Sequence, residues 1–267
     1  MQRKTSSERS RISRRGLERE LSAAADPPRA VILQRFFKTG KGEYAEGDRF
    51  LGLTVPLQRK IALRYRALPL DGLARLLSSP IHEYRFAALE ILVAQFEAAE
   101  PARREEIVSF YLRHAQRMNN WDLVDTSAPY LLGEHLKDRP RGLLDALAAS
   151  ANLWERRIAI VATLALLRHG ETKDTFRIAK KLLPDRHDLI HKAVGWALRE
   201  AGKVSQPALL QFLRKHYGSI PRTTLRYAIE RFPAIERRRM LKGVFIGAEG
   251  AALPKPGGKA KKVHAPR

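Results

Sequence analysis

One helical segment recurs in this chain at nearly constant intervals, and this repeat limits the possible folds more than any other feature. The segments align when Arg85, Asp122, Arg157, Lys192 and Arg226 are set as equivalent, at intervals of 37, 35, 35 and 34 residues. Their sequences are HEYRFAALEIL, NNWDLVDTSAPYLL, LWERRIAIVATLALL, LIHKAVGWALREAG and TTLRYAIERF. Such a period is typical of helix–turn–helix units, which bury their apolar faces only by stacking on neighbouring units.

The rest of the body also has a helical pattern. From Pro28 to about Gly243, helical patterns of roughly 10–18 residues end at prolines or glycines, and the alternation typical of strands is absent. The consensus of tetratricopeptide repeats is not visible, so HEAT-like units are favoured. We therefore predict an all-α fold, a HEAT-like helical-repeat superhelix (an α-solenoid) with a basic concave face, spanning residues 28–245.

Basic residues far outnumber acidic ones, with 50 Lys and Arg against 28 Asp and Glu and a formal net charge of +22. The excess is not confined to the ends, since residues 26–250 hold 38 basic and 25 acidic side chains. A folded body displays this surplus on its surface, which favours a polyanionic partner such as nucleic acid. The alternative is a soluble protein whose charge only prevents aggregation.

The two ends differ from the body in composition. Residues 1–27 are predicted to form a basic, disordered arm and residues 246–267 a basic, disordered tail. The arm lacks the apolar core of a secretory signal, and Glu8, Glu18 and Glu20 argue against an organelle transit peptide. No apolar run approaches the ~18–20 residues of a membrane span. We expect a cytoplasmic, bacterial-type protein that acts at the nucleoid as a monomer.

Cysteine is absent from the chain, which excludes disulfides, cysteine-ligated zinc and iron–sulfur clusters. The eight histidines include no HExxH motif. We therefore expect neither a metal nor a cofactor.

Four residues from three repeats are predicted to face one groove. Relative to the aligned position, Trp121 lies at −1, Asp125 at +3, Arg157 at 0 and Trp196 at +4. At 100° per residue these offsets fall within an arc of about 140°, which is one face of a helix. Because equivalent helices of successive repeats lie side by side, the four side chains are predicted to converge on one surface.

These side chains also have ordinary structural interpretations. Asn119 or Asn120 would cap a helix with Asp122 in its positive first turn, and we adopt this interpretation for Asp122. Trp154 is assigned to the core, the usual place of a large aromatic residue, and the other two tryptophans could be core residues as well. Arg157 could be a solvated charge, although a stack of basic groups on one face favours a phosphate contact.

Five ordered segments, spread over about residues 29–243, form a recognisable set. They are FLGLTVP at Phe50–Pro56, HEYRFAALEIL, NNWDLVD, LWERRIAI and HKAVGWALRE. In these segments the chain resembles the AlkD-type DNA alkylation repair proteins. The resemblance implies a HEAT-like superhelix that excises positively charged N3- and N7-alkylpurines from double-stranded DNA.

The resemblance also implies roles for individual residues. The catalytic aspartate of the family falls on Asp125, and its two sugar-contacting tryptophans fall on Trp121 and Trp196. Its phosphate-contacting arginine falls on Arg157, and a tyrosine in its first helices corresponds to Tyr44.

One position departs from the family pattern. Thr54 stands where some members carry an amide side chain, which puts that duplex contact in doubt. The family also contains DNA binders without glycosylase activity, but these lack parts of the active-site set that this chain keeps.

The implied residue types suit the implied reaction. A cationic purine is a good leaving group, and an oxocarbenium-like sugar is stabilised by a fixed carboxylate and by the negative faces of indoles. No lysine lies among these groups, so we expect a monofunctional enzyme without strand cleavage. The resemblance further implies that the damaged base stays stacked rather than flipped. Two other readings are a catalytically silent repeat protein that binds DNA and, on the period alone, an RNA-binding pentatricopeptide array.

Overall fold

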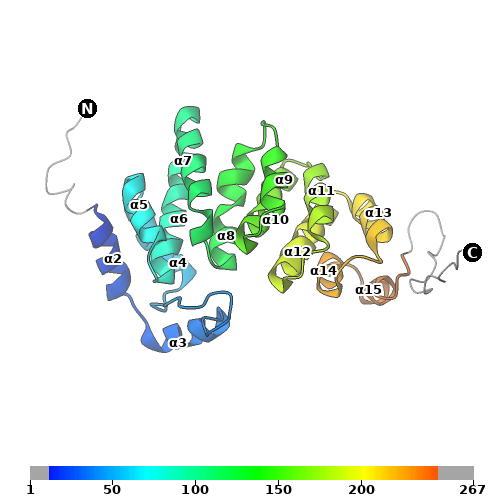
Figure 1. The fold of residues 1–267 in the computed structure, drawn as a ribbon, viewed down its shortest axis with the longest axis horizontal. Helices are drawn as coiled ribbons and strands as arrows, with labels where there is room; N and C mark the ends of the chain where they lie inside the picture. Colours follow the sequence, from blue (N-terminus) through cyan, green and yellow to red (C-terminus); the bar gives the residue numbers. More distant parts are fainter. Residues whose placement is uncertain (1–11, 246–267) are drawn as a thin grey trace, which may run out of the picture. The chain divides into compact units, whose positions relative to one another are not determined.

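The computed structural model describes residues 12–245, and the chain is all-α over that range (Figure 1). The only β-type pairing among the described residues is an isolated bridge between Arg49 and Ile81. The predicted tail at residues 246–267 and the first eleven residues of the predicted arm lie outside the described residues. The chain divides into two compact units, Met1–His169 and Gly170–Arg267.

The first unit holds the helices up to α10. They are α2 (Arg14–Ala23), α3 (Pro27–Phe36), α4 (Val55–Arg64), α5 (Leu70–Leu77), α6 (His82–Glu97), α7 (Pro101–Arg113), the 3-10 turn η1 (Ala115–Arg117), α8 (Trp121–Ser127), the π-helical turn η2 (Pro129–Gly133), α9 (Gly142–Ala148) and α10 (Leu153–Arg168). The second unit holds α11 (Lys173–Leu182), α12 (Asp188–Val204), α13 (Gln206–His216), α14 (Arg222–Ala228) and α15 (Ala234–Met240).

The helices that carry the aligned positions are neighbours within each unit. In the first unit α6 packs on α8 and α8 on α10, and in the second unit α12 packs on α14 (Figure 1). Helix α4, which holds no aligned residue, also packs on α6. Each aligned residue lies within the first five residues of its helix. The prediction that equivalent helices of successive repeats lie side by side is confirmed within each unit.

The prediction of a disordered arm over residues 1–27 is wrong for α2. Ser13 caps this helix by accepting a hydrogen bond from the amide of Gly16, and Leu17 and Leu21 are fully buried. The helix packs on α4, α5 and α6. The Arg- and Ser-rich composition suggested disorder. However, Leu17 and Leu21 stand at i,i+4 spacing, so they share one side of α2 and pack against the rest of the unit.

The segment between α3 and α4 is bound to the N-terminal end of α6. The buried carboxylate of Glu83 accepts the amides of Leu51, Gly52 and Leu53 at 2.9, 2.8 and 3.3 Å. Gly52 has a φ of 93°, and a Cβ there would lie 2.1 Å from the carbonyl oxygen of Asp26. Only glycine fits this position, which explains the glycine in the Phe50–Pro56 motif.

In the second unit, a glycine brings α12 and α14 close together. A Cβ on Gly195 would lie 2.5 Å from the Cβ of Tyr227 and 2.7 Å from the carbonyl oxygen of Thr224. Thr224 also donates its hydroxyl hydrogen to the carbonyl of His191 at 3.0 Å. This close contact fixes the part of α12 that carries Trp196.

Candidate active site

A bidentate ion pair joins two of the predicted site residues. Asp125 lies on α8 and Arg157 on the neighbouring α10, with Arg157 Nε 2.9 Å from Asp125 Oδ1 and Nη2 2.7 Å from Oδ2. The Arg157 side chain is 6% exposed and that of Asp125 is 19% exposed. Parallel N–H···O bonds of this kind hold a carboxylate in one orientation. The carboxylate is therefore fixed while it keeps some contact with solvent.

The electrostatics of Asp125 reflect two opposing effects. Burial raises the pKa of its carboxyl above the ordinary value, because it disfavours the charged form. The guanidinium of Arg157 lowers the pKa, and the carboxylate of Asp122 adds a smaller increase. Arg157 thus supplies the charge that supports the carboxylate form in a poorly solvated place.

Trp121 is the first residue of α8. The side chain of Asn120 caps the helix by accepting the Trp121 amide at 2.8 Å, so Asn120 is the cap that the sequence predicts. Trp121 and Asp125 are four residues apart and lie on the same side of this helix. The indole is partly buried and stacks on Phe37, with ring centroids 5.3 Å apart and an interplanar angle of 27°. One part of the indole therefore packs as core residues do.

A buried histidine lies behind this stack. His82, the first residue of α6, stacks on Phe50 at 4.5 Å and on Phe37 at 5.3 Å. Its Nε2 bonds to Asp122 Oδ2 at 2.8 Å, and its Nδ1 is 3.6 Å from Asp48 Oδ2. Asp122 lies in the first turn of α8 as predicted, and it also ties that turn to α6.

The charge state of His82 follows from its neighbours. Burial lowers the pKa of the imidazole, and so does the cation of Arg85. The carboxylates of Asp122 and Asp48 outweigh both effects and raise the pKa from 6.5 to about 9. Arg85 itself is bound to Asp48 at 2.5 Å. Sequence reasoning missed this network, since only the HE pair at the start of HEYRFAALEIL points to it.

Tyr44 lies outside the helices, so its predicted place in the first helices is wrong. It lies in the turns between α3 and α4, where two glycines with positive φ, Gly42 and Gly47, interrupt any helix. Its ring meets Trp154 edge-on, with centroids 6.1 Å apart. Trp154 is 6% exposed, as its assignment to the core predicts. Tyr44 therefore lies at the start of α10, the helix that carries Arg157.

Trp196 and Thr54 complete the predicted set. Trp196 lies on α12 in the second unit and is partly buried. Its convergence with Trp121 and Asp125 stays a prediction. Thr54 is exposed at the N-cap of α4, where its side chain makes no capping hydrogen bond.

The backbone after Asp125 leaves regular helical geometry. Pro129 has no N–H, so the amide that would bond to the carbonyl of Asp125 four residues earlier is missing. The chain continues as the π-helical turn η2, where the Gly133 amide bonds to the carbonyl of Ala128 at 2.9 Å. Turns of this kind occur often at functional sites.

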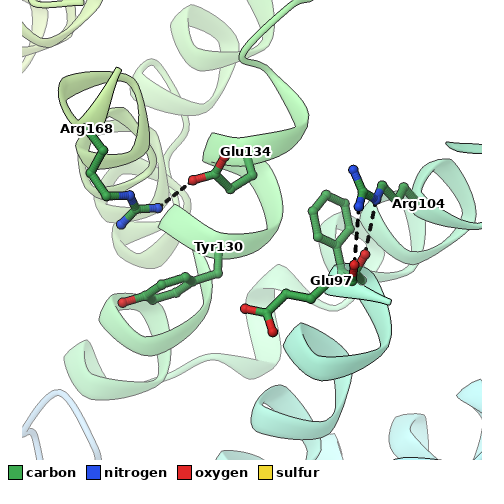
Figure 2. A pocket seen from close by; sticks show the side chains of 6 residues that line it. Glu97, Arg104, Tyr130, Glu134 and Arg168 are labelled. Carbon is green, nitrogen blue, oxygen red and sulfur yellow. Dashed lines mark hydrogen bonds and ion pairs between the residues drawn. The ribbon is translucent and has the colours of Figure 1, made fainter. Parts of the chain in front are cut away.

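A separate hollow of about 510 Å³ lies at the C-terminal ends of α6 and α10 (Figure 2). It is lined by Phe96, Glu97, Arg104, Tyr130, Glu134 and Arg168. Arg168 bonds to Glu134 at 2.7 Å, and its Cζ lies 5.0 Å from the centroid of the Tyr130 ring. Figure 2 shows the Arg168–Glu134 bond as a dashed line. From Arg157 to Arg168, α10 rises about 16 Å. The hollow therefore lies away from the Asp125 carboxylate.

Within residues 12–245, no cluster of three or more His, Asp or Glu side chains could hold a metal ion. Over the same range, none of the helices combines the length and apolar character required to cross a bilayer.

The chain is similar in sequence to one protein family and in fold to a solved structure. Residues 17–232 match the sequence profile of the family described as DNA alkylation repair enzyme. A solved structure, titled as a predicted DNA alkylation repair enzyme from Enterococcus faecalis, superposes with a TM-score of 0.61. That match has 16% identity and covers 79% of this chain and 97% of the other, so it shows a shared fold. No curated protein sequence matches the chain. The family match spans most of the chain and includes the segments that carry Trp121, Asp125 and Arg157, and the chain belongs to the DNA alkylation repair enzyme family.

Proposed function

We propose that this protein is a DNA N-glycosylase that hydrolyses the glycosidic bond of cationic N3- and N7-alkylpurines in double-stranded DNA. One observation carries the proposal: a partly exposed carboxylate, Asp125, is held by Arg157 on two oxygens, one helical turn from the indole of Trp121. Membership of a DNA alkylation repair family supplies the substrate class.

The reaction needs stabilisation of the sugar more than help for the leaving base. An alkylated purine leaves as a neutral base, and its positive charge moves to the deoxyribose as the bond stretches. Asp125 faces this charge and positions the attacking water. A carboxylate whose orientation is already fixed reorganises little when the charge develops, which is where a preorganised site gains its rate.

The two indoles are proposed to flank the sugar. The negative face of an indole attracts a developing cation, each contact being worth about 0.5–2 kcal/mol. Trp121 is positioned for this by its stacking on Phe37. The family resemblance suggests roles for two further residues. Trp196 is proposed to contact the sugar, and Tyr44 is proposed to contact the duplex.

Arg157 is proposed to have two roles. Its guanidinium orients Asp125, and it contacts the phosphate beside the lesion. A guanidinium suits both tasks, because its planar fork of N–H donors matches a carboxylate or a phosphate bidentately.

The residues of the site also suggest that the DNA strand is not cleaved after the base has left. None of the residues proposed to meet the sugar is a lysine, so no Schiff base forms and the abasic strand stays intact. The base is proposed to remain stacked, which predicts tolerance of bulky cationic adducts and poor excision of neutral uracil.

The decisive experiment is incubation with methylated duplex DNA, followed by detection of free 7-methylguanine and of abasic sites. We expect release by the unaltered protein and none by Asp125→Asn. A uracil-containing duplex serves as the neutral control. Duplex binding without base release would instead identify a non-catalytic DNA-binding member of the family.

A further inference from the structure

Helix α3 exposes apolar side chains to an unusual degree. Val31 is 52% exposed, Ile32 65% and Phe36 61%, whereas Ala30 is the one buried residue of this helix. With Arg35, these side chains fall within an arc of about 140° at 100° per residue, so they share one side of α3. Apolar groups clustered in this way mark a surface that binds a partner.

This side of α3 is continuous with the candidate active site. Phe36 meets Trp121 edge-on, with ring centroids 6.1 Å apart and an interplanar angle of 73°. Its neighbour Phe37, which is buried in a cluster with Ala30 and Phe50, stacks on the same indole. A molecule in contact with the solvent side of Trp121 therefore lies beside Phe36.

Two cations lie next to these apolar groups. Arg35 and Lys38 are exposed, and within residues 12–245 neither forms an ion pair. Lys38 has a φ of 53°, the left-handed position after a helix where glycine is the usual residue. A lysine there is kept at a conformational cost, and it adds a free cation to the end of α3.

We propose that the α3 surface, formed by Val31, Ile32, Arg35, Phe36 and Lys38, binds the DNA duplex beside the lesion. Phe36 contacts the bases, as apolar wedges do at base steps, and the two cations contact phosphates. The inference rests on the proposed function for the identity of the substrate. A second copy of the chain fits this surface less well, since a symmetric contact would place the same cations against one another.

The test compares Phe36→Ala with Ile235→Ala. Ile235 is 58% exposed on α15 in the second unit, so it matches Phe36 in exposure and lies outside α3. Affinity is measured by fluorescence anisotropy on a duplex with a tetrahydrofuran abasic-site analogue, which cannot be cleaved. We expect Phe36→Ala to weaken binding about 10-fold, a typical loss for one base-contacting aromatic, and Ile235→Ala to leave it unchanged.

The salt dependence separates the apolar contact from the phosphate contacts. Phe36→Ala should leave the slope of log affinity against log salt unchanged, whereas Arg35→Ala and Lys38→Ala should each reduce it by about 0.9. Phe36→Trp should restore most of the affinity. Equal affinity of Phe36→Ala and the unaltered protein would overturn the proposal. So would a dimer, seen by light scattering, that Phe36→Ala converts to a monomer.

The outcomes also separate this inference from the proposed function. Weak binding by Phe36→Ala, together with no base release by the unaltered protein, would contradict the glycosylase and leave the α3 surface in place. Base release by the unaltered protein, together with normal binding by Phe36→Ala, would support the glycosylase and contradict the α3 surface.

Discussion

Arg157 binds both carboxylate oxygens of Asp125, through Nε at 2.9 Å and Nη2 at 2.7 Å. The arginine predicted to contact DNA is thus also the residue that orients the predicted catalytic group. The proposed binding of the phosphate and the observed fixing of the carboxylate are therefore linked in one side chain. Substitutions at these two positions should therefore not have independent effects.

Removal of the carboxylate charge should stop the reaction. Asp125→Asn keeps the shape of the side chain but loses the charge that is proposed to face the sugar, so base release should fall by at least about 100-fold. Duplex affinity should change only a few-fold. The measurement is release of 7-methylguanine under single-turnover conditions, with circular dichroism as a control for folding. Release at the normal rate would show that Asp125 is not the catalytic group.

Arg157→Gln should impair both binding and turnover. The phosphate contact is lost, which lowers the slope of log affinity against log salt by about 0.9. The Asp125 carboxylate is also freed, which lowers single-turnover release at saturating DNA. Arg168→Gln is the matched control, because Arg168 lies on the same helix and pairs with Glu134 instead. A slope that stays the same would place Arg157 away from the DNA backbone.

The buried imidazolium of His82 should make folding stability depend on pH. The folded-state pKa is about 9 and the ordinary value is 6.5, so the stabilisation is fully present below pH 6.5. It should disappear as the pH rises from 6.5 to about 9, with a loss of about 3 kcal/mol. Urea unfolding at pH 6 and at pH 9 measures this change. His82→Gln should remove most of this pH dependence. If the free energy of unfolding of His82→Gln falls between pH 6 and pH 9 as much as that of the unaltered protein, another group is responsible.

The convergence of the two indoles can be tested without a structure of the complex. Trp121→Ala and Trp196→Ala should each lower kcat/KM by roughly 2–30-fold, the range of one cation–π contact. If both indoles touch one sugar, the double variant should deviate from the product of the single effects. Strictly multiplicative effects would mean that Trp196 acts somewhere else.

Lys38→Gly should separate stability from binding. Relief of the left-handed lysine should raise the free energy of unfolding by up to about 1 kcal/mol. Loss of the cation should at the same time weaken binding of duplex DNA and lower its salt dependence. Thermal unfolding and anisotropy titrations measure the two effects. A variant that binds DNA as the unaltered protein does would exclude Lys38 from the interface.

The repeat made most of the fold predictable. Helical units of nearly constant length force equivalent helices to pack on one another, so one alignment located α6, α8, α10, α12 and α14. Local rules also sufficed at the start of α8, where Asn120 caps the helix. Failures came where a local signal was weak or masked. The charge of the first residues concealed α2, and the turn-forming glycines around Tyr44 were not recognised as the end of helical structure.

The site was less predictable than the fold, because its contacts connect residues far apart in the chain. Spacing placed Trp121 and Asp125 on one side of a helix, but it could not show that Arg157 reaches the carboxylate. Nor could it show that His82 reaches Asp122 from another repeat. Such pairs depend on the exact approach of two helices, which the period alone does not determine.

The first two residues of α6 have a consequence for how this protein could change. His82 holds the first turn of α8 through Asp122, while its neighbour Glu83 holds the backbone of Leu51–Leu53. Both side chains are buried, whereas Phe36 is largely open to solvent. The side chains that set the geometry of the site are thus buried, whereas a side chain proposed to touch the substrate is exposed. Exposed positions could vary from one descendant to the next, and so alter which damaged nucleotides are accepted, without disturbing the interior on which the chemistry depends.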